Sequence, residues 1–242
     1  DILSNYPDYP TAISKEYGRV FVSVPEEHDQ VVYNVPNSLF TVFPGEDHGL
    51  HSDAATMEIL QNTCRNMQNE GGNDLVFINL QAVRLGMLDL ERFKRQVNYC
   101  LLPNGTASNR VMQIHGRYSD MTNYGFMDNM GVWFENFALP VVINECMMQT
   151  YDGTIRLFPN WPLNKDAEFF NLRAAGAFLV SASLYNGTVT EIQISSEAGG
   201  TLKIILPWAD GVKMISRNGE QSIKSNIVSI ETIRGEKITF TK

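Results

Sequence analysis

The spacing of apolar residues changes once along this chain of 242 residues. Up to about residue 150, apolar residues recur three or four apart, in segments that begin near Ser, Asp or Asn and in part end at Gly, as in amphipathic helices. After Tyr151 they alternate with polar residues in short runs between glycine turns, as in strands. The sequence therefore predicts an α+β, multidomain chain with a helical part followed by a β part.

Capping residues set the predicted helix starts. Asp53 and Asp89 each precede an apolar periodic segment, and an aspartate there accepts hydrogen bonds from the first free amides of a helix. Pro140 falls inside the last helical segment, so we expect a kink or a break there. The predicted helices cover residues 53–69, 73–86, 89–101 and 132–150.

Residues 1–50 form an irregular lead-in with five prolines and two β-like runs, 19–24 and 31–35. Such a length without regular structure is uncommon inside a compact domain. The four helices also have more apolar surface than they can cover among themselves. We therefore expect the chain to be a piece of a larger protein, with the rest supplied by a missing N-terminal region or by a second subunit.

Seven short strands are predicted in the remainder, in an antiparallel sheet or sandwich. Asn186-Gly187 is a strong two-residue hairpin turn, and Asn218-Gly219 and Arg234-Gly235 are similar. We place the domain boundary at residue 160, with a partial helical region over 1–160 and an antiparallel β domain over 161–242. The predicted strands are 155–158, 177–184, 189–194, 202–206, 212–215, 227–230 and 237–241.

Charge and composition exclude several classes of function. The net charge is −8, and no run of Lys or Arg exceeds two residues, so we expect no nucleic-acid partner. The longest apolar stretch, 132–148, is interrupted by Glu135, Pro140 and Glu145, so no membrane span is expected. The three cysteines and four histidines lack metal-ligand spacing, and no nucleotide-binding fingerprint occurs. We expect neither a metal nor a cofactor.

Residues 126–131, Phe-Met-Asp-Asn-Met-Gly, resemble the segment Q-I-D-G-N-F-G of glycoside hydrolase family 95, the α-L-fucosidase family. Further segments resemble the family in the same order, so that the resemblance covers roughly residues 40–206. They are VFPGE at 42–46, VINECMMQT at 142–150, DGTIRLFPNWP at 152–162, LRAAGAF at 172–178 and SSEAGG at 195–200.

The resemblance implies the end of an (α/α)6 toroid followed by a C-terminal β domain. It implies cleavage of terminal α-L-fucosides, or related sugars such as α-L-galactosides, with inversion. Asp128 matches the family's aspartate on the base side, whereas the general acid and the water-orienting asparagines lie outside this chain. The sequence departs from the family where Thr122 replaces a histidine six residues before the aspartate, and His115 lies thirteen residues before it.

Asp128 also precedes a predicted helix, where an aspartate is commonly just a cap. Around it we expect sugar contacts from aromatic faces, a forked arginine and polar side chains. These substrate-binding candidates are His115, Arg117, Tyr124, Asn129 and Trp133. Glu135 and Glu145 are further acids, with salt bridges as their alternative.

A second candidate region is the glycine-rich loop that carries Glu46, Asp47, His48 and His51. Its alternative is a solvated loop without function. Because a helical toroid forms its pocket from loops at one end, this loop is a candidate for the entrance of the same pocket as Asp128.

The sequence therefore leads to three hypotheses. The first is the C-terminal portion of an inverting glycoside hydrolase with a carbohydrate substrate, inactive as this chain alone. The second is a non-catalytic carbohydrate-binding or scaffold module. The third is a sibling (α/α)6 glycosidase or phosphorylase that acts on another glycan. The resemblance also implies a periplasmic or extracellular bacterial location.

Overall fold

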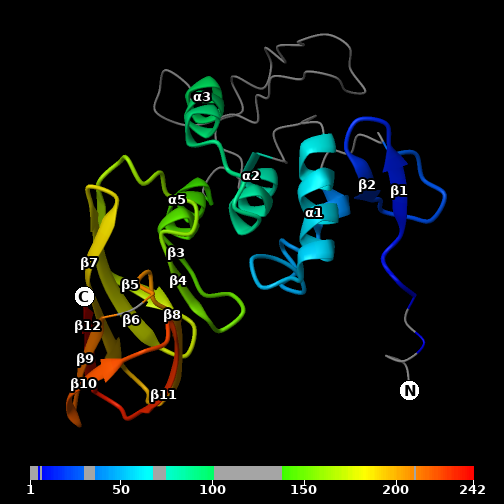
Figure 1. Cartoon of the computed structure of the whole chain (residues 1–242). Coiled ribbons are helices and arrows are strands. Elements are labelled where there is room, and N and C mark those ends of the chain that lie inside the picture. The colour runs from blue at the N-terminus through cyan, green and yellow to red at the C-terminus, as the bar shows by residue number, and fades with distance from the viewer. Residues whose placement is uncertain (1–4, 6, 30–35, 68–74, 101–137, 210) are drawn as a thin grey trace. The chain divides into compact units, whose positions relative to one another are not determined.

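The computed structural model describes residue 5 and residues 7–29, 36–67, 75–100, 138–209 and 211–242 (Figure 1). The chain divides into two compact units, residues 1–142 and 143–242, which we call the helical unit and the β unit. In the part of the chain that is described, no helix is long and apolar enough to cross a membrane.

The helical unit begins with an antiparallel hairpin and continues with helices joined by loops. The hairpin pairs Thr11 with Phe21 and Ser14 with Gly18. The elements are β1 (Thr11–Ser14), β2 (Gly18–Phe21), the 3-10 helix η2 (Asn37–Leu39), α1 (Ala54–Asn66), α2 (Leu75–Arg84) and α3 (Leu90–Cys100), and α5 (Leu139–Met147) follows.

Two predicted helix caps are confirmed. Asp53 Oδ1 accepts hydrogen bonds from the backbone N–H groups of Ala55 and Thr56, both at 3.0 Å. Asp89 Oδ1 does the same for the first turn of α3, at 2.9 Å. Each carboxylate therefore satisfies two of the amides that have no partner within the helix.

The prediction for the last helix needs correction. Pro140 lies in the first turn of α5, where a proline has no helical hydrogen bond to remove. The described helix begins at Leu139, which is compatible with a break near Pro140, and a kink stays a prediction. The helix ends at Met147 rather than near Thr150, because the next two residues pair as strand β3. The predicted start near residue 132 lies outside the described residues.

Helix α2 is buried on almost all sides, including polar residues. Asn79 Nδ2 donates to the Leu75 carbonyl at 2.6 Å and to Gln96 Oε1 of α3 at 3.1 Å. Gln81 and Arg84 donate to the loop that precedes α1, as described below. These buried donors are therefore satisfied, which is the condition for keeping polar groups in a protein interior.

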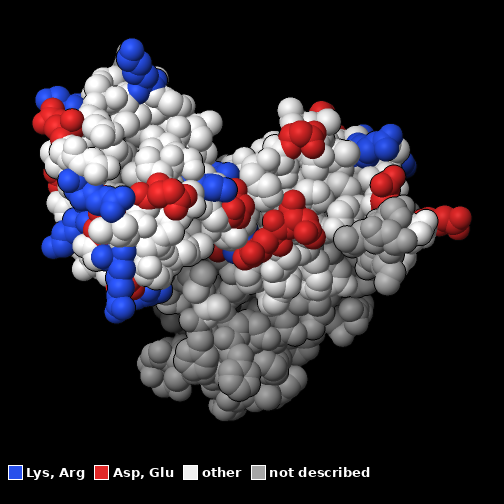
Figure 2. Space-filling model, turned by 90° about the horizontal axis from the view of Figure 1, so that it is seen from below, with Lys and Arg blue, Asp and Glu red and all other residues white. Residues whose placement is uncertain are grey.

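The two units differ in formal charge. Residues 1–142 contain 9 Lys and Arg against 17 Asp and Glu, whereas residues 143–242 contain 10 of each. The whole net charge of −8 thus belongs to the helical unit. In the view of Figure 2, Lys and Arg side chains gather over the β unit, on the left.

The β unit consists of two sheets. One has the strand order β10-β9-β12-β7-β6-β5 and the other β11-β8-β4-β3. Neighbouring strands are antiparallel except β4 and β8, which are parallel. The strands are β3 (Met148–Gln149), β4 (Ile155–Leu157), β5 (Ala167–Ala174), β6 (Phe178–Tyr185), β7 (Thr188–Ser196), β8 (Gly200–Ile205), β9 (Val212–Ser216), β10 (Gly219–Ile223), β11 (Ile227–Thr232) and β12 (Lys237–Thr241).

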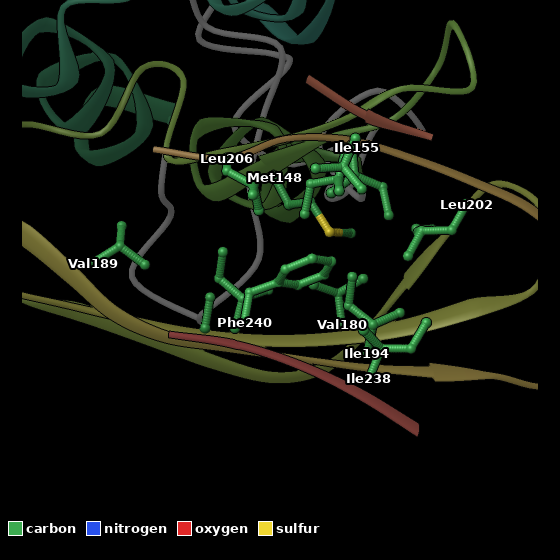
Figure 3. Close-up of a cluster of buried hydrophobic side chains, with 14 of the residues drawn as sticks. Met148, Ile155, Val180, Val189, Ile194, Leu202, Leu206, Ile238 and Phe240 are labelled. Carbon is green, nitrogen blue, oxygen red and sulfur yellow. The ribbon is translucent and has the colours of Figure 1, made fainter. Parts of the chain in front are cut away.

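The core of the β unit lies between these sheets (Figure 3). Val180 and Phe240 of the six-stranded sheet are fully buried, and Met148 and Leu202 come from the other sheet. The alternation that predicted the strands is visible in β6, where every second residue from Phe178 is buried. Each strand therefore contributes one apolar face to a common interior.

The sequence-predicted strands all occur, with small shifts at their ends, but three more were not predicted. These are β3, β5 and β10. Segment 143–160, which the sequence analysis assigned to the helical part, contributes β3 and β4 to the four-stranded sheet. A helical region followed by a β domain is thus present. The described helices do not show a toroid, which stays a prediction.

Candidate functional site

The catalytic and sugar-contact residues expected from the resemblance all lie outside the described residues, so their arrangement stays a prediction. They are Asp128, His115, Arg117, Tyr124, Asn129 and Trp133, together with Glu135. Glu145 is described and lies half-buried on α5. The other candidate region, the loop with Asp47 and His48, borders a hollow of the helical unit.

This hollow has a volume of about 410 Å³, which is in the range of small-ligand pockets. Two segments that are distant in sequence form it: the hairpin of β1 and β2 with its flanks, and η2 with the residues after it. We call it the Tyr9 pocket. Its lining residues are Tyr9, Pro10, Phe21, Val22, Ser23, Asn37, Ser38, Phe40 and Thr41.

Three rings gather beside the Tyr9 pocket. Phe21 and His48 are stacked, with centroids 6.1 Å apart and planes inclined by 18°. Tyr9 meets both of them edge-on, at 6.2 Å from Phe21 and 5.4 Å from His48. The hairpin causes this arrangement. The Val22 N–H donates to the Pro10 carbonyl, and this hydrogen bond brings Tyr9 next to Phe21.

A carboxylate lies next to the ring cluster. The Tyr9 hydroxyl donates to Asp47 Oδ2 at 3.2 Å, and His51 Nε2 lies 3.2 Å from the Asp47 backbone oxygen. His48 Nδ1 lies 2.9 Å from Thr41 Oγ1. Three of the four polar residues singled out in this loop are therefore together beside the pocket, although none of the four is among its lining residues, and Glu46 is exposed.

Partial burial lowers the pKa of His48, because it removes water from the charged form of the ring. The nearby Asp47 carboxylate opposes this shift, but burial is the larger effect. The lowered pKa therefore favours the neutral form of the His48 ring. A neutral, stacked imidazole offers a flat surface and does not add a second charge beside Asp47.

Helix α2 holds the loop of the Tyr9 pocket from the protein interior. Arg84 Nη1 donates to the carbonyl oxygens of Val42 at 3.0 Å and Gly45 at 3.3 Å. Its guanidinium also lies over the Phe43 ring, 5.1 Å from the centroid. Gln81 Nε2 donates to the Pro36 and Phe43 carbonyls at 3.1 and 2.9 Å. The backbone of one pocket wall is thus fixed before any ligand arrives.

The loop also requires a glycine at position 45. A Cβ built there would lie 2.5 Å from the Phe40 carbonyl oxygen, closer than real contacts of this kind. The Gly45 N–H donates to the same oxygen at 2.8 Å. The chain therefore turns back on itself tightly, and this turn presents Phe40 and Thr41 to the pocket.

Ser23 leaves a hydrogen-bonding group unused in the pocket wall. Its backbone N–H donates to Glu27 Oε2 at 2.7 Å, but its Oγ is buried and has no hydrogen-bond partner among the described residues. Asn37, Ser38 and Thr41 add uncharged polar groups to a lining that is mainly apolar.

The arrangement fits a ligand with one apolar face and several hydroxyl groups. The lining rings supply a surface for C–H groups, and the amide and hydroxyl side chains of the wall can both donate and accept hydrogen bonds. Within the described ranges, no three His, Cys, Asp or Glu side chains are grouped so that they could hold a metal ion.

The sequence analysis missed Tyr9 and Phe21, because it treated residues 1–50 as an irregular lead-in. One signal was present. The β-like run predicted at 19–24 is confirmed in part by β2, and a strand needs a partner strand because its backbone N–H and C=O groups must be paired. The partner is β1, and Tyr9-Pro10 directly precedes it. The other β-like run, 31–35, lies outside the described residues.

Comparisons with known proteins do not identify a family for this chain. No family model matches the sequence, and no curated protein matches it. One solved structure that matches is a GH127 β-L-arabinofuranosidase from Geobacillus stearothermophilus T6, at 10% identity and a TM-score of 0.26. The match covers 77% of this chain and 31% of that one, so this chain spans less than a third of its length. At this TM-score the match establishes neither the fold nor the function of this chain.

Proposed function

We propose that the chain is the C-terminal portion of an inverting glycoside hydrolase that acts on terminal α-L-fucosides or related sugars. The observation that supports a carbohydrate ligand is the Tyr9 pocket, whose lining combines aromatic rings with several uncharged polar groups. Beside the pocket, the Tyr9 hydroxyl donates to the Asp47 carboxylate. A sugar ring has the matching surface, because its C–H groups contact aromatic faces while its hydroxyls need hydrogen-bond partners.

The catalytic part of the proposal depends on the resemblance to glycoside hydrolase family 95. Asp128 is proposed to act on the base side, where a carboxylate activates the attacking water. The general acid is proposed to lie in a part of the protein outside this chain, and the described helices are proposed to belong to a larger (α/α)6 toroid. Substrate contacts are proposed for His115, Arg117, Tyr124, Asn129 and Trp133.

A non-catalytic carbohydrate-binding module is the second candidate, and one observation favours it. None of the nine residues that line the Tyr9 pocket is an Asp or Glu, and Asp47 lies beside the ring cluster as a hydrogen-bond acceptor for Tyr9. Inverting hydrolysis needs an acid and a base about 6.5–9.5 Å apart. The Tyr9 pocket by itself therefore supports binding of a sugar rather than its cleavage.

Calorimetric titration of the chain with methyl α-L-fucoside tests the carbohydrate part. Tyr9→Ala removes one ring and the hydroxyl that contacts Asp47, and we expect about tenfold weaker binding, or about 1.4 kcal/mol. Tyr185→Ala is the matched control, because Tyr185 is also an exposed tyrosine that donates to a carboxylate, Glu168 Oε2 at 3.0 Å, but in the β unit. Equal losses of affinity in both variants would show that the Tyr9 pocket is not the binding site.

Hydrolysis of an aryl α-L-fucoside by the longest natural form of the protein tests the catalytic part. We expect Asp128→Asn to abolish turnover and the control Asp166→Asn to keep it, with the inverted anomer as the first product in NMR spectra. Binding without turnover in the unaltered protein would favour the non-catalytic module. Turnover of another glycan alone would favour a sibling glycosidase or phosphorylase.

We also propose that the protein is exported to the periplasm or the cell exterior. The support is the resemblance alone. Fractionation of the producing cells tests this, and recovery of the protein only with the cytoplasmic fraction would contradict it.

A further inference from the structure

A second hollow lies in the β unit, where the turn after β9 meets the turn between β11 and β12. It also has a volume of about 410 Å³. Its lining includes three cations, Arg217, Arg234 and Lys237, and one carboxylate, Glu236. We call it the Arg234 pocket. A surplus of cations on one hollow is unusual in a unit whose Lys and Arg balance its Asp and Glu, and in a protein of net charge −8.

The one carboxylate of this pocket is already satisfied. Glu236 is buried, with 8% of its surface exposed, and its Oε2 accepts the Ile233 N–H at 3.1 Å. Arg217 Nε lies 3.5 Å from the same oxygen. The Glu236 carboxylate therefore compensates Arg217 and orients it, while the Nη groups of that guanidinium stay available for a ligand.

The two remaining cations have no such compensation. Neither Arg234 nor Lys237 forms an ion pair with any part of the chain that the structure describes. Both side chains are exposed, so each is solvated in the absence of a ligand. Two such charges on a common hollow attract an anionic group.

The pocket is built on fixed backbone. Gly235 has φ +83°, and its N–H donates to the Ser196 carbonyl at 2.7 Å, which ties the turn to the end of β7. The Glu236 N–H closes the turn by donating to Ile233 at 3.1 Å. Lys237 then starts β12, which pairs with β7 and with β9. Three strands of one sheet thus hold the cations in place.

We propose that the Arg234 pocket binds an acidic saccharide, a sugar that carries a carboxylate or a sulfate group. The charge selects an oxyanion, and a guanidinium fork matches the two oxygens of such a group. The volume selects something larger than a bare ion, since even one water molecule takes up only about 30 Å³ in the liquid. This site is distinct from the Tyr9 pocket. Its cations select the oxyanion, whereas the choice of a sugar as the carrier of that group rests on the carbohydrate function proposed above.

NMR titration of the isotope-labelled chain with glucuronate tests the proposal. We expect chemical-shift changes at residues 216–217 and 233–237, weaker binding at high salt, and no such changes with glucose, which has the same ring without the charge. Sulfate alone is expected to bind more weakly than glucuronate. Glucose that binds equally, or sulfate that binds as tightly as glucuronate, would overturn the proposal.

A pair of charge-matched double variants tests which cations bind glucuronate. R234Q/K237Q removes the two uncompensated cations of the pocket, and we expect at least a tenfold loss of affinity for glucuronate. K203Q/K224Q removes two exposed cations elsewhere in the β unit and should leave the affinity within about twofold. Equal losses in the two variants would show a general charge effect and contradict the site. An unchanged thermal midpoint verifies that each variant is folded.

Discussion

The two units of the chain bury their interiors in different ways. In the β unit, alternate residues of successive strands enter one apolar layer between two sheets, and Val180, Ile192 and Phe240 are fully buried there. In the helical unit, α2 is buried together with polar groups, and Gln81 and Arg84 hold a loop through hydrogen bonds. The first interior is mainly apolar, with a few buried polar pairs such as Ser196 with Thr232, whereas in the second, polar side chains of a buried helix hold a loop.

The two pockets show the same contrast in their chemistry. Their volumes are equal at about 410 Å³. The Tyr9 pocket combines rings with uncharged polar groups, although it belongs to the unit that carries the whole net negative charge. The Arg234 pocket gathers cations in the unit without net charge. Volume alone therefore does not distinguish the ligands, and the lining residues do.

The largest effect is expected from the apolar core of the β unit. Phe240→Ala removes a fully buried ring and should lower the free energy of unfolding of this unit by about 3–5 kcal/mol. The control Phe170→Ala changes the same residue type on β5, where the ring is 69% exposed, and should be nearly neutral. Hydrogen exchange followed by mass spectrometry measures the protection of backbone amides in both units in one experiment. Equal loss of protection in α1 would contradict separate units.

The next effect is expected from the polar interior of the helical unit. Arg84→Met keeps much of the volume but leaves the Val42 and Gly45 carbonyls without their donor, which should cost about 2–4 kcal/mol. Arg65→Met removes an exposed arginine of α1 and serves as the control. Hydrogen exchange should increase over residues 36–45 and stay unchanged in β5 to β7. No change over 36–45 would show that the loop does not depend on Arg84.

A smaller effect is expected at the hairpin turn of β6 and β7. Gly187 has φ +74°, and an added Cβ would lie 3.3 Å from the Leu163 carbonyl oxygen, so Gly187→Ala should destabilise the β unit by about 1–2 kcal/mol. Ala177 has φ +60° with a Cβ present, so Ala177→Gly should have the opposite sign and stabilise by up to about 1 kcal/mol. Urea unfolding of both variants measures this difference. If both variants changed the free energy of unfolding in the same direction, the assignment of backbone strain to these two positions would be wrong.

The smallest effect is expected at the cap of α1, and it depends on pH. The Thr56 hydroxyl and the first-turn amides lower the pKa of Asp53 below its usual 3.8. The unfolded chain therefore binds this proton more readily, so the contribution of the cap is present above about pH 4 and is lost as the pH falls through the lowered folded-state value. Asp53→Asn keeps a capping side chain that does not titrate.

The variant should therefore show a flatter acid dependence of unfolding than the natural chain, measured by urea titrations above and below pH 4. Asp8→Asn, at an exposed position outside any helix, is the control. An unchanged acid dependence in Asp53→Asn would show that the cap does not contribute through its charge.

Much of the fold could be predicted from the sequence where one local signal sufficed. Asp53 and Asp89 marked helix starts, and Asn186-Gly187 marked a hairpin in which both residues have positive φ. Strand β10 gave no such signal, because none of its residues is buried and apolar residues do not alternate in it. Strand β5 was hidden because the register shifts between Phe169 and Leu172, with Asn171 at φ +53°, so its alternation is interrupted.

The site could be predicted only in part, because only some of its residues are close together in the sequence. Asp47, His48 and His51 were noticed because they are close in sequence within a glycine-rich loop. Tyr9 and Phe21 join them only through the pairing of β1 with β2 and through packing against His48, which no single segment encodes. Arg84 acts from a helix some forty residues later.

Binding of a neutral sugar to the helical unit is the central claim, and NMR titration of the labelled chain with methyl α-L-fucoside tests it most directly. Among the described residues, we expect chemical-shift changes within 9–23 and 37–51, and none in the β unit. No changes at saturating sugar, or changes at residues 216–237 instead, would contradict a sugar site at Tyr9, Phe21 and Asp47.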